Sequence, residues 1–435
     1  MTYFKVREAI FPITLLAFEA IGVKYWNVIF TNSTRWVLVA ILFLSVLMRG
    51  QFLLAFRTRS GFLLAAYLFW CTFTITWSEM PELSMLKSIA LIVIVMALSA
   101  AGQAWTFHSE RNAPFGFLLP IVILALFAGF FDRGAAYTQG TIKIYQGLSG
   151  NPNFLGAIAA MSIPYAVWQA YKNRTRMGAY VICISIITGL LVALWYSGSR
   201  SSMLAALSIF TVFFVALSPK KRIMAFGLVG VLSLSAAIAA PAIQASLYER
   251  FVVKGDLRDQ DVFATRQEVW SKSYDLAQQG GVVGAGYGVT IGAPIGFSVL
   301  SFGLTSVGYG REKGNTALAI WEETGMVGLV LYVLLILTIM LELGLCFARI
   351  KDQDRKVQLG LLFGAILGFT IQSFFEAWWV APGSAEFAFF WAIVGAAQGL
   401  VRRANFRGQP VRQRVLNARY QTTGARAAPS AATGA

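Results

Sequence analysis

The sequence predicts an all-α, polytopic membrane protein with about twelve transmembrane helices and one large polar loop. Its 435 residues are 57% hydrophobic and only 13% charged, whereas soluble domains are about 25% charged. Apolar runs long enough to cross about 30 Å of hydrocarbon recur along the chain, and a helix satisfies its own backbone there. We place the spans at residues 10–30, 34–48, 61–77, 88–105, 114–131, 154–171, 178–196, 203–218, 223–243, 326–346, 357–377 and 387–401.

Basic residues mark alternate connections between these spans. Each connection after an even-numbered span holds Lys or Arg, as at Lys220, Lys221 and Arg222, whereas the intervening short connections hold few cations. By the positive-inside rule, both termini face the cytoplasm, and residues 242–325, between spans nine and ten, face the opposite side. Residues 1–401 therefore form one transmembrane domain, and the basic stretch 402–435 is expected to be a disordered cytoplasmic tail.

The net charge of +16 does not indicate nucleic acid as a partner. Much of that charge lies in the cytoplasmic connections and the tail, where it orients the protein and meets the anionic lipid bilayer. The three cysteines (Cys71, Cys183 and Cys346) lie within apolar runs and are expected to be buried thiols. The single histidine, His108, falls in a cytoplasmic connection. With no carboxylate cage or nucleotide-binding loop in the sequence, we expect metal-free chemistry and no cofactor.

Five outer-face segments stand out as the places that could carry chemistry, at residues 77–82, 147–156, 196–202, 266–288 and 313–328. In the fourth, Arg266 is followed by Trp270 and a glycine turn at 284–288. In the fifth, the spacing is carried by Asn315, Leu318, Glu323, Gly325 and Gly328.

In order and spacing, these motifs resemble the O-antigen ligase and polysaccharide polymerase superfamily over about residues 70–400. The family loop reads Arg, then Trp, then Gly-x-Gly-Tyr-Gly, then His-Asn-x-x-Leu-x-x-x-x-Glu-x-Gly-x-x-Gly. This chain departs from it at one place, because Gly314 stands where the family has His, with Lys313 beside it. The departure favours an exopolysaccharide-type branch over a lipopolysaccharide ligase.

The resemblance implies a metal-independent glycosyltransferase of the bacterial inner membrane with a periplasmic active site. Its donor would be an oligosaccharide on undecaprenyl diphosphate. Its acceptor would be a sugar hydroxyl, either on another lipid-linked repeat or on the lipid A core, and the sequence leaves both open. For this activity, the candidate residues are Arg200, Arg266, Lys313 and Glu323 as catalytic, and Asn315, Trp270, Tyr287 and Asn153 as substrate-binding; of these, Arg266, Trp270, Tyr287, Asn315 and Glu323 match the family pattern. Arginine suits a departing diphosphate because its guanidinium is always charged and binds phosphate in a bidentate manner.

Plainer roles remain open for several of these residues. Arg266 fits a solvated helix face paired with nearby carboxylates, and only the family pattern favours catalysis. Lys313 has an even chance of replacing the electrostatic role of the missing histidine, while Glu323 is expected to hold the acceptor or to orient Arg266. Asn153 belongs to an Asn-Pro-Asn stretch that fits a helix cap better than a substrate contact.

Two further groups of residues have roles that the sequence leaves open. The glycine turn at 284–288 is expected to bring the loop close to the membrane domain. Trp378, Trp379 and Trp391 are expected in an interfacial belt, with sugar stacking by the first two as a minor alternative.

Two other function classes are kept. A transporter or channel fits the span count, although the spans show no internal repeat of the kind that transporters commonly carry. A glycan-export assembly factor without catalysis is the weaker alternative.

Overall fold

The computed structural model describes residues 2–24, 26–108, 133–138, 144–219, 264–291 and 313–407. The described part is helical throughout, apart from an isolated antiparallel bridge between Tyr137 and Tyr145. The α-helices are α1 (Thr2–Ala20), α2 (Asn32–Met48), α3 (Arg59–Phe73), α4 (Pro81–His108), α6 (Arg133–Ala136), α7 (Pro152–Lys172), α8 (Met177–Ser197), α9 (Arg200–Ala216), α12 (Ala264–Gly280), α13 (Thr316–Arg349), α14 (Gln353–Gln372) and α15 (Ala385–Arg407). Four 3₁₀ turns join them, η1 (Trp26–Val28), η2 (Phe52–Phe56), η3 (Thr74–Thr76) and η6 (Trp378–Val380).

The predicted fold class is confirmed as all-α with membrane helices. Three helices are long and apolar enough to cross a membrane, namely α4 over Pro81–Thr106, α8 and α13, and shorter apolar helices lie at Ala9–Ala20, Asn32–Met48 and Arg200–Ala216. The predicted spans at 114–131 and 223–243, much of the loop 242–325 and the tail beyond residue 407 lie outside the described residues. Helix α15 continues through the first residues of the predicted tail, as far as Arg407.

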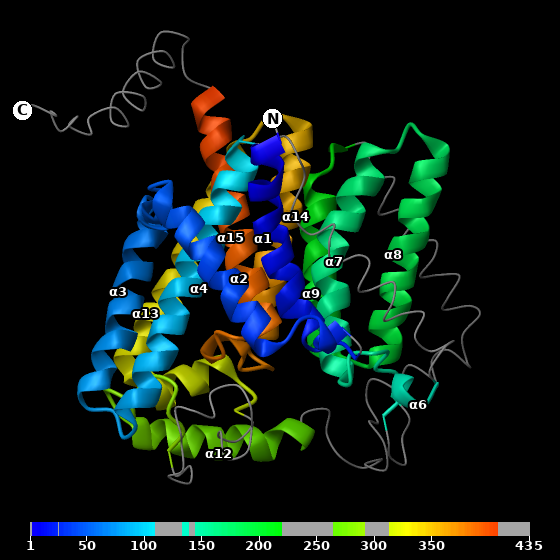
Figure 1. The fold of residues 1–435 in the computed structure, drawn as a ribbon. Coiled ribbons are helices and arrows are strands. Elements are labelled where there is room, and N and C mark those ends of the chain that lie inside the picture. Colours follow the sequence, from blue (N-terminus) through cyan, green and yellow to red (C-terminus); the bar gives the residue numbers. More distant parts are fainter. Residues whose placement is uncertain are drawn as a thin grey trace, which may run out of the picture.

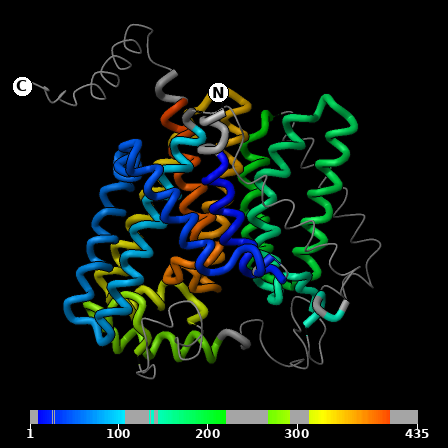
Figure 2. The backbone as a smooth tube through the Cα atoms, viewed as in Figure 1, coloured from blue at the N-terminus to red at the C-terminus, as the bar shows by residue number. Residues whose placement is uncertain are grey.

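Most helices run side by side in one bundle, and α12 lies across one end of it (Figure 1). Within the bundle α15 packs along α4, α14 along α9, and α7 along α8. The start of α1 and the end of α15 lie at the opposite end from α12 (Figure 2). The turn between α8 and α9 lies at the α12 end, so α12, this turn and the connection from α14 to α15 share one end of the molecule.

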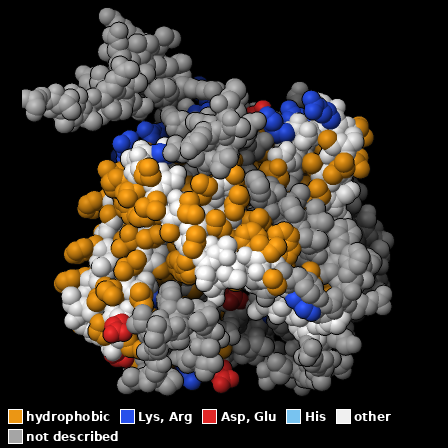
Figure 3. Space-filling model, viewed as in Figure 1, with side chains coloured by type: hydrophobic (Ala, Val, Ile, Leu, Met, Phe, Trp, Pro, Cys, Tyr) orange, Lys and Arg blue, Asp and Glu red, His pale blue; other side chains and the backbone are white. Residues whose placement is uncertain are grey.

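Side-chain types follow the same axis in the space-filling view (Figure 3). Lys and Arg side chains gather at the end that holds the start of α1, and acidic side chains appear near α12. Hydrophobic side chains cover the surface between, and large ones such as Phe62, Met177 and Leu341 are exposed. An exposed apolar band between two polar ends is what a bilayer requires.

The centre of the bundle is aromatic. Trp379 and Trp391 are 1% and 2% exposed, Trp378 is 5% exposed, and the Trp379 indole N–H donates to the Tyr67 hydroxyl oxygen at 3.2 Å. The predicted interfacial belt is therefore wrong for these three tryptophans, because neighbouring helices enclose them. The same enclosure leaves Trp378 and Trp379 no open ring face on which a sugar would stack.

The cysteine prediction is confirmed in part. Cys71 is buried, Cys183 and Cys346 are half-buried, and all three are free thiols.

Candidate active site

Helix α13 contains a sharp interruption. It begins after Asn315, whose side-chain oxygen accepts from the Leu318 N–H at 3.1 Å as the N-cap. At Gly325 the backbone leaves the helical region, with φ 72° and ψ −176°. An interrupted helix exposes carbonyl and N–H groups on both sides of the break, and buried groups of this kind need partners.

Residues 281–291, which we call the docking segment, supply those partners. Ala285 N–H donates to the Glu322 carbonyl at 3.1 Å, and Gly286 N–H donates to the Glu323 carbonyl at 2.9 Å. From beyond the break, Met326 N–H donates to the Gly281 carbonyl at 3.1 Å. The kink and the docking segment therefore satisfy each other through backbone hydrogen bonds.

Residues of the first outer segment close the other side of this joint. The Trp77 indole N–H donates to the Gly284 carbonyl at 3.1 Å, and Glu79 N–H donates to the Ala285 carbonyl at 3.1 Å. The Trp70 indole N–H donates to the Thr324 carbonyl at 2.8 Å, next to the kink. Three of the outer-face segments singled out in the sequence thus meet here.

The glycine turn makes this close approach possible. Gly284, Gly286 and Gly288 all have positive φ, at 79°, 118° and 83°, a region that other residues rarely adopt. A Cβ atom at Gly284 would collide with the Glu323 backbone, and one at Gly288 would collide with the Lys87 side chain. The prediction that these glycines let the loop turn tightly against the membrane domain is confirmed.

A buried charge cluster, formed by Lys313, Glu322 and Glu323, lies beneath the docking segment. Lys313 is 7% exposed and the two glutamates 0% and 1%. The Lys313 ammonium lies 2.7 Å from Glu323 Oε1 and 3.5 Å from Glu322 Oε2. A buried charge needs a close partner and further hydrogen bonds, because leaving water costs several kcal/mol per ion.

The docking segment provides those additional hydrogen bonds. Gly288 N–H donates to Glu323 Oε2 at 2.7 Å, and Ile291 N–H donates to Glu322 Oε1 at 3.1 Å. Lys313 Nζ also donates to the Val289 carbonyl at 3.4 Å. Lys313 is thus held by two carboxylates and a carbonyl, and it forms an ion pair with each of Glu322 and Glu323.

Helix α12 is attached to the same place. The Trp270 indole N–H donates to the Gly314 carbonyl at 3.1 Å, and the Ser273 hydroxyl donates to the Lys313 carbonyl at 2.8 Å. The Trp270 ring also packs on Phe375, with ring centroids 5.9 Å apart. These contacts fix α12 across the end of the bundle.

The start of α13 is joined to the turn after α14. Asn315 Nδ2 donates to the Phe374 carbonyl at 3.0 Å, and the Thr316 hydroxyl donates to the Glu376 carbonyl at 3.0 Å. The Glu376 carboxylate in turn accepts from Asn153 Nδ2 at 3.2 Å. Asn315 and Asn153 therefore serve as structural links in the described chain, and both lie at the α12 end.

The cap predicted for the Asn-Pro-Asn stretch is confirmed. The Asn151 side-chain oxygen accepts from the N–H groups of Asn153 and Phe154, and Pro152 opens α7. Asn151 is thus the N-cap that this motif predicts.

The two arginines belong to elements at this same end. Arg200 is half-buried and is the first residue of α9, two positions after the left-handed Gly198 that caps the end of α8. Nearby, Ser202 joins α9 to α14 by accepting from Gln372 Nε2 at 3.1 Å. Arg266 lies in the first turn of α12, and its side chain lies outside the described residues, as does any contact between the two guanidinium groups.

The remaining candidate, Tyr287, is fully buried. Its backbone N–H donates to the Thr74 hydroxyl oxygen at 2.9 Å, so it anchors the docking segment and has no open surface. Lys87 and Glu322 are the residues that sequence reasoning missed. The available signals were a lysine in the second turn of an apolar helix and a doubled glutamate before a Gly-x-x-Gly pattern.

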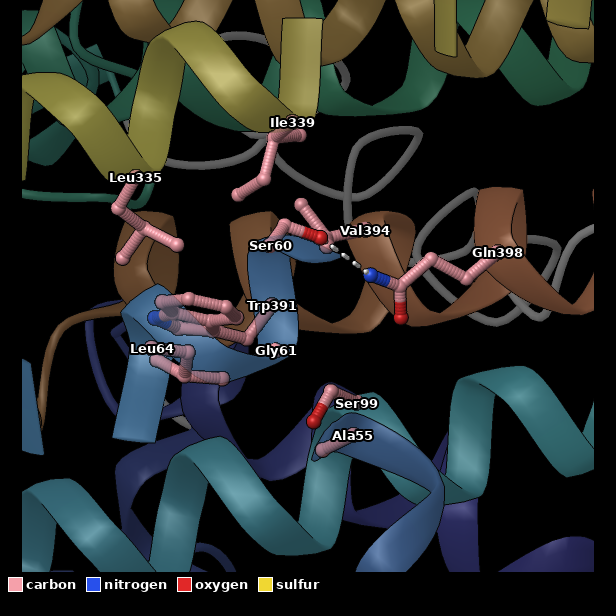
Figure 4. A pocket seen from close by; sticks show the side chains of 10 residues that line it. All are labelled: Ala55, Ser60, Gly61, Leu64, Ser99, Leu335, Ile339, Trp391, Val394 and Gln398. Carbon is pink, nitrogen blue, oxygen red and sulfur yellow. Dashed lines mark hydrogen bonds between the residues drawn. The ribbon is translucent and has the colours of Figure 1, made fainter. Parts of the chain in front are cut away.

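One small cavity lies apart from this region, between α3, α4, α13 and α15 (Figure 4). Its volume is about 10 Å³, comparable with a single water site, and Gln398 Nε2 donates across it to Ser60 Oγ at 3.5 Å. It is too small for a sugar. Among the residues that the structure describes, no three His, Cys, Asp or Glu side chains are grouped to hold a metal.

Comparison with known families identifies the segment that contains most of these features. No curated protein matches the chain. The family model described as O-Antigen ligase, Wzy_C, matches residues 184–333. The match runs from within α8 through Arg200, α12, the docking segment and the buried charge cluster to the kinked part of α13. Over residues 184–333, this chain is therefore similar to the O-antigen ligase domain of the Wzy_C family.

Proposed function

We propose that this chain is a multi-pass inner-membrane enzyme that transfers a glycan from undecaprenyl diphosphate to a sugar hydroxyl at the periplasmic face. The Wzy_C match supports O-antigen ligase or polymerase-type glycan transfer. The observation that carries the finer proposal is the attachment of α12 by Trp270 and Ser273 at the bundle end where α9 begins. This attachment brings two arginine-bearing helix starts to one end of the molecule.

The proposed chemistry exchanges one glycosidic partner for another. An acceptor hydroxyl oxygen attacks the anomeric carbon of the donor, and the bond from that carbon to the diphosphate oxygen breaks. Undecaprenyl diphosphate leaves with the bonding electrons, the proton of the attacking hydroxyl passes to solvent, and Arg200 and Arg266 bind the charge that the diphosphate gains. Contacts that strengthen as this charge develops accelerate the reaction as well as bind the donor.

Lys313 and Glu323 have a different part in this proposal. Their 2.7 Å ion pair holds the start of α13 and the docking segment together, and so keeps α12 in place. Asn315, Trp270, Tyr287 and Asn153 act in the same way, by shaping the site. About twelve spans, both termini in the cytoplasm and the α12 end in the periplasm complete the arrangement.

The proposal is tested with purified protein in lipid nanodiscs and a lipid-linked oligosaccharide donor. Release of undecaprenyl diphosphate and growth of the glycan are measured together. We expect Arg200→Ala and Arg266→Ala each to lower turnover by about 10²–10³-fold, the range seen when one transition-state hydrogen-bond donor is removed. Arg176→Ala is the matched control, and it should retain wild-type turnover. Arg176 is exposed and lies just before the start of α8, at the end of that helix away from Arg200.

The same assay separates the rival functions. A transporter would move intact donor across the bilayer and release no undecaprenyl diphosphate, and an assembly factor would do neither. Normal turnover in both arginine variants would reject the roles given to these residues. A deletion strain scored for capsule or exopolysaccharide against O-antigen on lipopolysaccharide then distinguishes polymerase from ligase.

A further inference from the structure

Lys87 lies on α4, far outside the matched segment 184–333. It is half-buried in the second turn of the helix. Its ammonium donates to the Gly288 carbonyl at 3.0 Å, and its side-chain stem packs so closely on Gly288 that a Cβ there would overlap it. A cation from the membrane bundle thus reaches the middle of the docking segment.

Lys87 brings a second positive charge toward the buried charge cluster. Among the residues that the structure describes, Glu322 and Glu323 are adjacent, almost fully buried carboxylates, and Lys313 forms ion pairs with both. The Glu323 carboxylate attracts the Lys87 ammonium, while the Lys313 ammonium repels it. Buried carboxylates need close positive charge, so the loss of a neighbouring cation is destabilising.

The Gly288 peptide connects the two halves of the arrangement. Its N–H donates to Glu323 Oε2 at 2.7 Å, while its carbonyl accepts from Lys87. The docking segment is therefore held between a lysine on α4 and a glutamate on α13. Loss of either side chain leaves the other bound to one face of a loop that is no longer fixed.

We propose that Lys87 is a positioning residue that holds the Gly288 peptide against the buried charge cluster and thereby fixes the docking segment and α12 against the bundle. It touches neither donor nor acceptor in this proposal. It acts by holding the loop whose first helix carries Arg266, so its catalytic consequence rests on the glycan-transfer function proposed above. Its structural consequence does not, and the two are measured separately.

The structural measurement is amide hydrogen exchange on the full chain in detergent. In Lys87→Met, the amides of residues 284–289 should exchange at least about tenfold faster than in the wild type, because local opening governs their protection. Lys87→Arg, which keeps the charge, should restore most of the protection. Lys351→Met removes an exposed lysine at the other end of the molecule and should change nothing. Unchanged exchange in Lys87→Met would overturn the proposal whatever the protein catalyses.

The catalytic measurement is turnover per folded molecule, with folded protein quantified by gel filtration. We expect Lys87→Met to lower kcat by about 10-fold or more and to raise the donor KM, since small misplacements of binding groups reduce rates this much. In a Glu323→Gln background, the same change should cost less than about threefold, because residues in one ion-pair network are not additive. Equal losses in both backgrounds, or losses explained entirely by less folded protein, would overturn the positioning role.

If the wild-type chain shows no glycan transfer, the proposed function fails while the hydrogen-exchange result still decides the role of Lys87. If transfer is present but residues 284–289 keep their protection in Lys87→Met, only the inference about Lys87 fails.

Discussion

At residue 314, where the family pattern that the sequence resembles has histidine, the backbone adopts a conformation that suits glycine. Gly314 has φ 61°, a left-handed conformation that costs most residues about 1–2 kcal/mol. Its carbonyl receives the Trp270 indole, so the strained turn is also the point where α12 is attached. The absence of a histidine here accompanies a backbone geometry that favours glycine.

The requirement for glycine at this turn is directly testable. Gly314→Ala should lower the free energy of unfolding by about 1 kcal/mol, measured by denaturant titration in detergent. Gly314→Asn should lose less, since asparagine tolerates the left-handed region better. The control is Gly178→Ala in α8, where a Cβ meets nothing within 4 Å. Equal stability of Gly314→Ala and the wild type would contradict the assigned backbone geometry.

Whether the sequence predicts the role of a residue depends on how far along the chain its partner lies. The Asn151 cap depends on neighbours within three residues, and the glycine turn at 284–288 was expected to pack on the membrane domain, although its partners could not be named. Lys87 and Gly288 are 201 positions apart, so no local pattern predicts their contact. The ion pair of Lys313 with Glu323 spans ten positions across a helix start, and spacing alone leaves its role open.

At the scale of elements, α13 consists of two helices joined at a kink. The sequence predicts a span starting at residue 326, and the backbone does leave the helical region at Gly325. What the sequence does not predict is the additional helix that begins at Thr316 and leads into this kink. The helix resumes because the docking segment satisfies the backbone groups that the kink exposes, and that partner lies about forty residues earlier in the chain.

The kink depends on the missing side chain at Gly325. A Cβ atom there would overlap the backbone of Val282 and Val283, and a ψ of −176° at positive φ is essentially reserved for glycine. We expect Gly325→Ala to destabilise the protein by about 1–3 kcal/mol and to expose the docking segment to limited proteolysis.

Gly344→Ala serves as the control for that change, because it lies in the same helix and its nearest neighbour would be an ordinary 3.7 Å from the new Cβ. It should be neutral or slightly stabilising, as alanine is favoured over glycine within a helix. Proteolysis that is equally fast in Gly325→Ala and in Gly344→Ala would argue against the joint.

For the molecule as a whole, composition was enough to predict the class, and basic residues were enough to predict an orientation. Both predictions, of the fold class and of the orientation, rest on properties summed over many residues. These are the length of the apolar runs and the total charge of the connections between them. The packing of α15 along α4, and the enclosure of Trp379 and Trp391, depend on which helices are neighbours. Aromatic residues near span ends suit a lipid interface and a helix interface equally well, so the sequence placed these two wrongly.

The proposed orientation is checked by cysteine labelling in a variant whose three native cysteines are replaced. Lys272→Cys on exposed α12 should react with a membrane-impermeant maleimide in intact spheroplasts. Lys351→Cys, exposed between α13 and α14, should react only after the membrane is permeabilised. The reverse pattern would place α12 in the cytosol and remove the basis for periplasmic glycan transfer.

The joint between the docking segment and the kink has a practical consequence. Backbone peptide groups form this joint, and the side chains of Val282 and Val283 remain 66% and 45% exposed. We expect replacements at these two positions to keep the backbone hydrogen bonds that anchor the docking segment. A fluorescent dye attached at residue 283 would then report, molecule by molecule, whether the docking segment separates from the kink when a substrate is added.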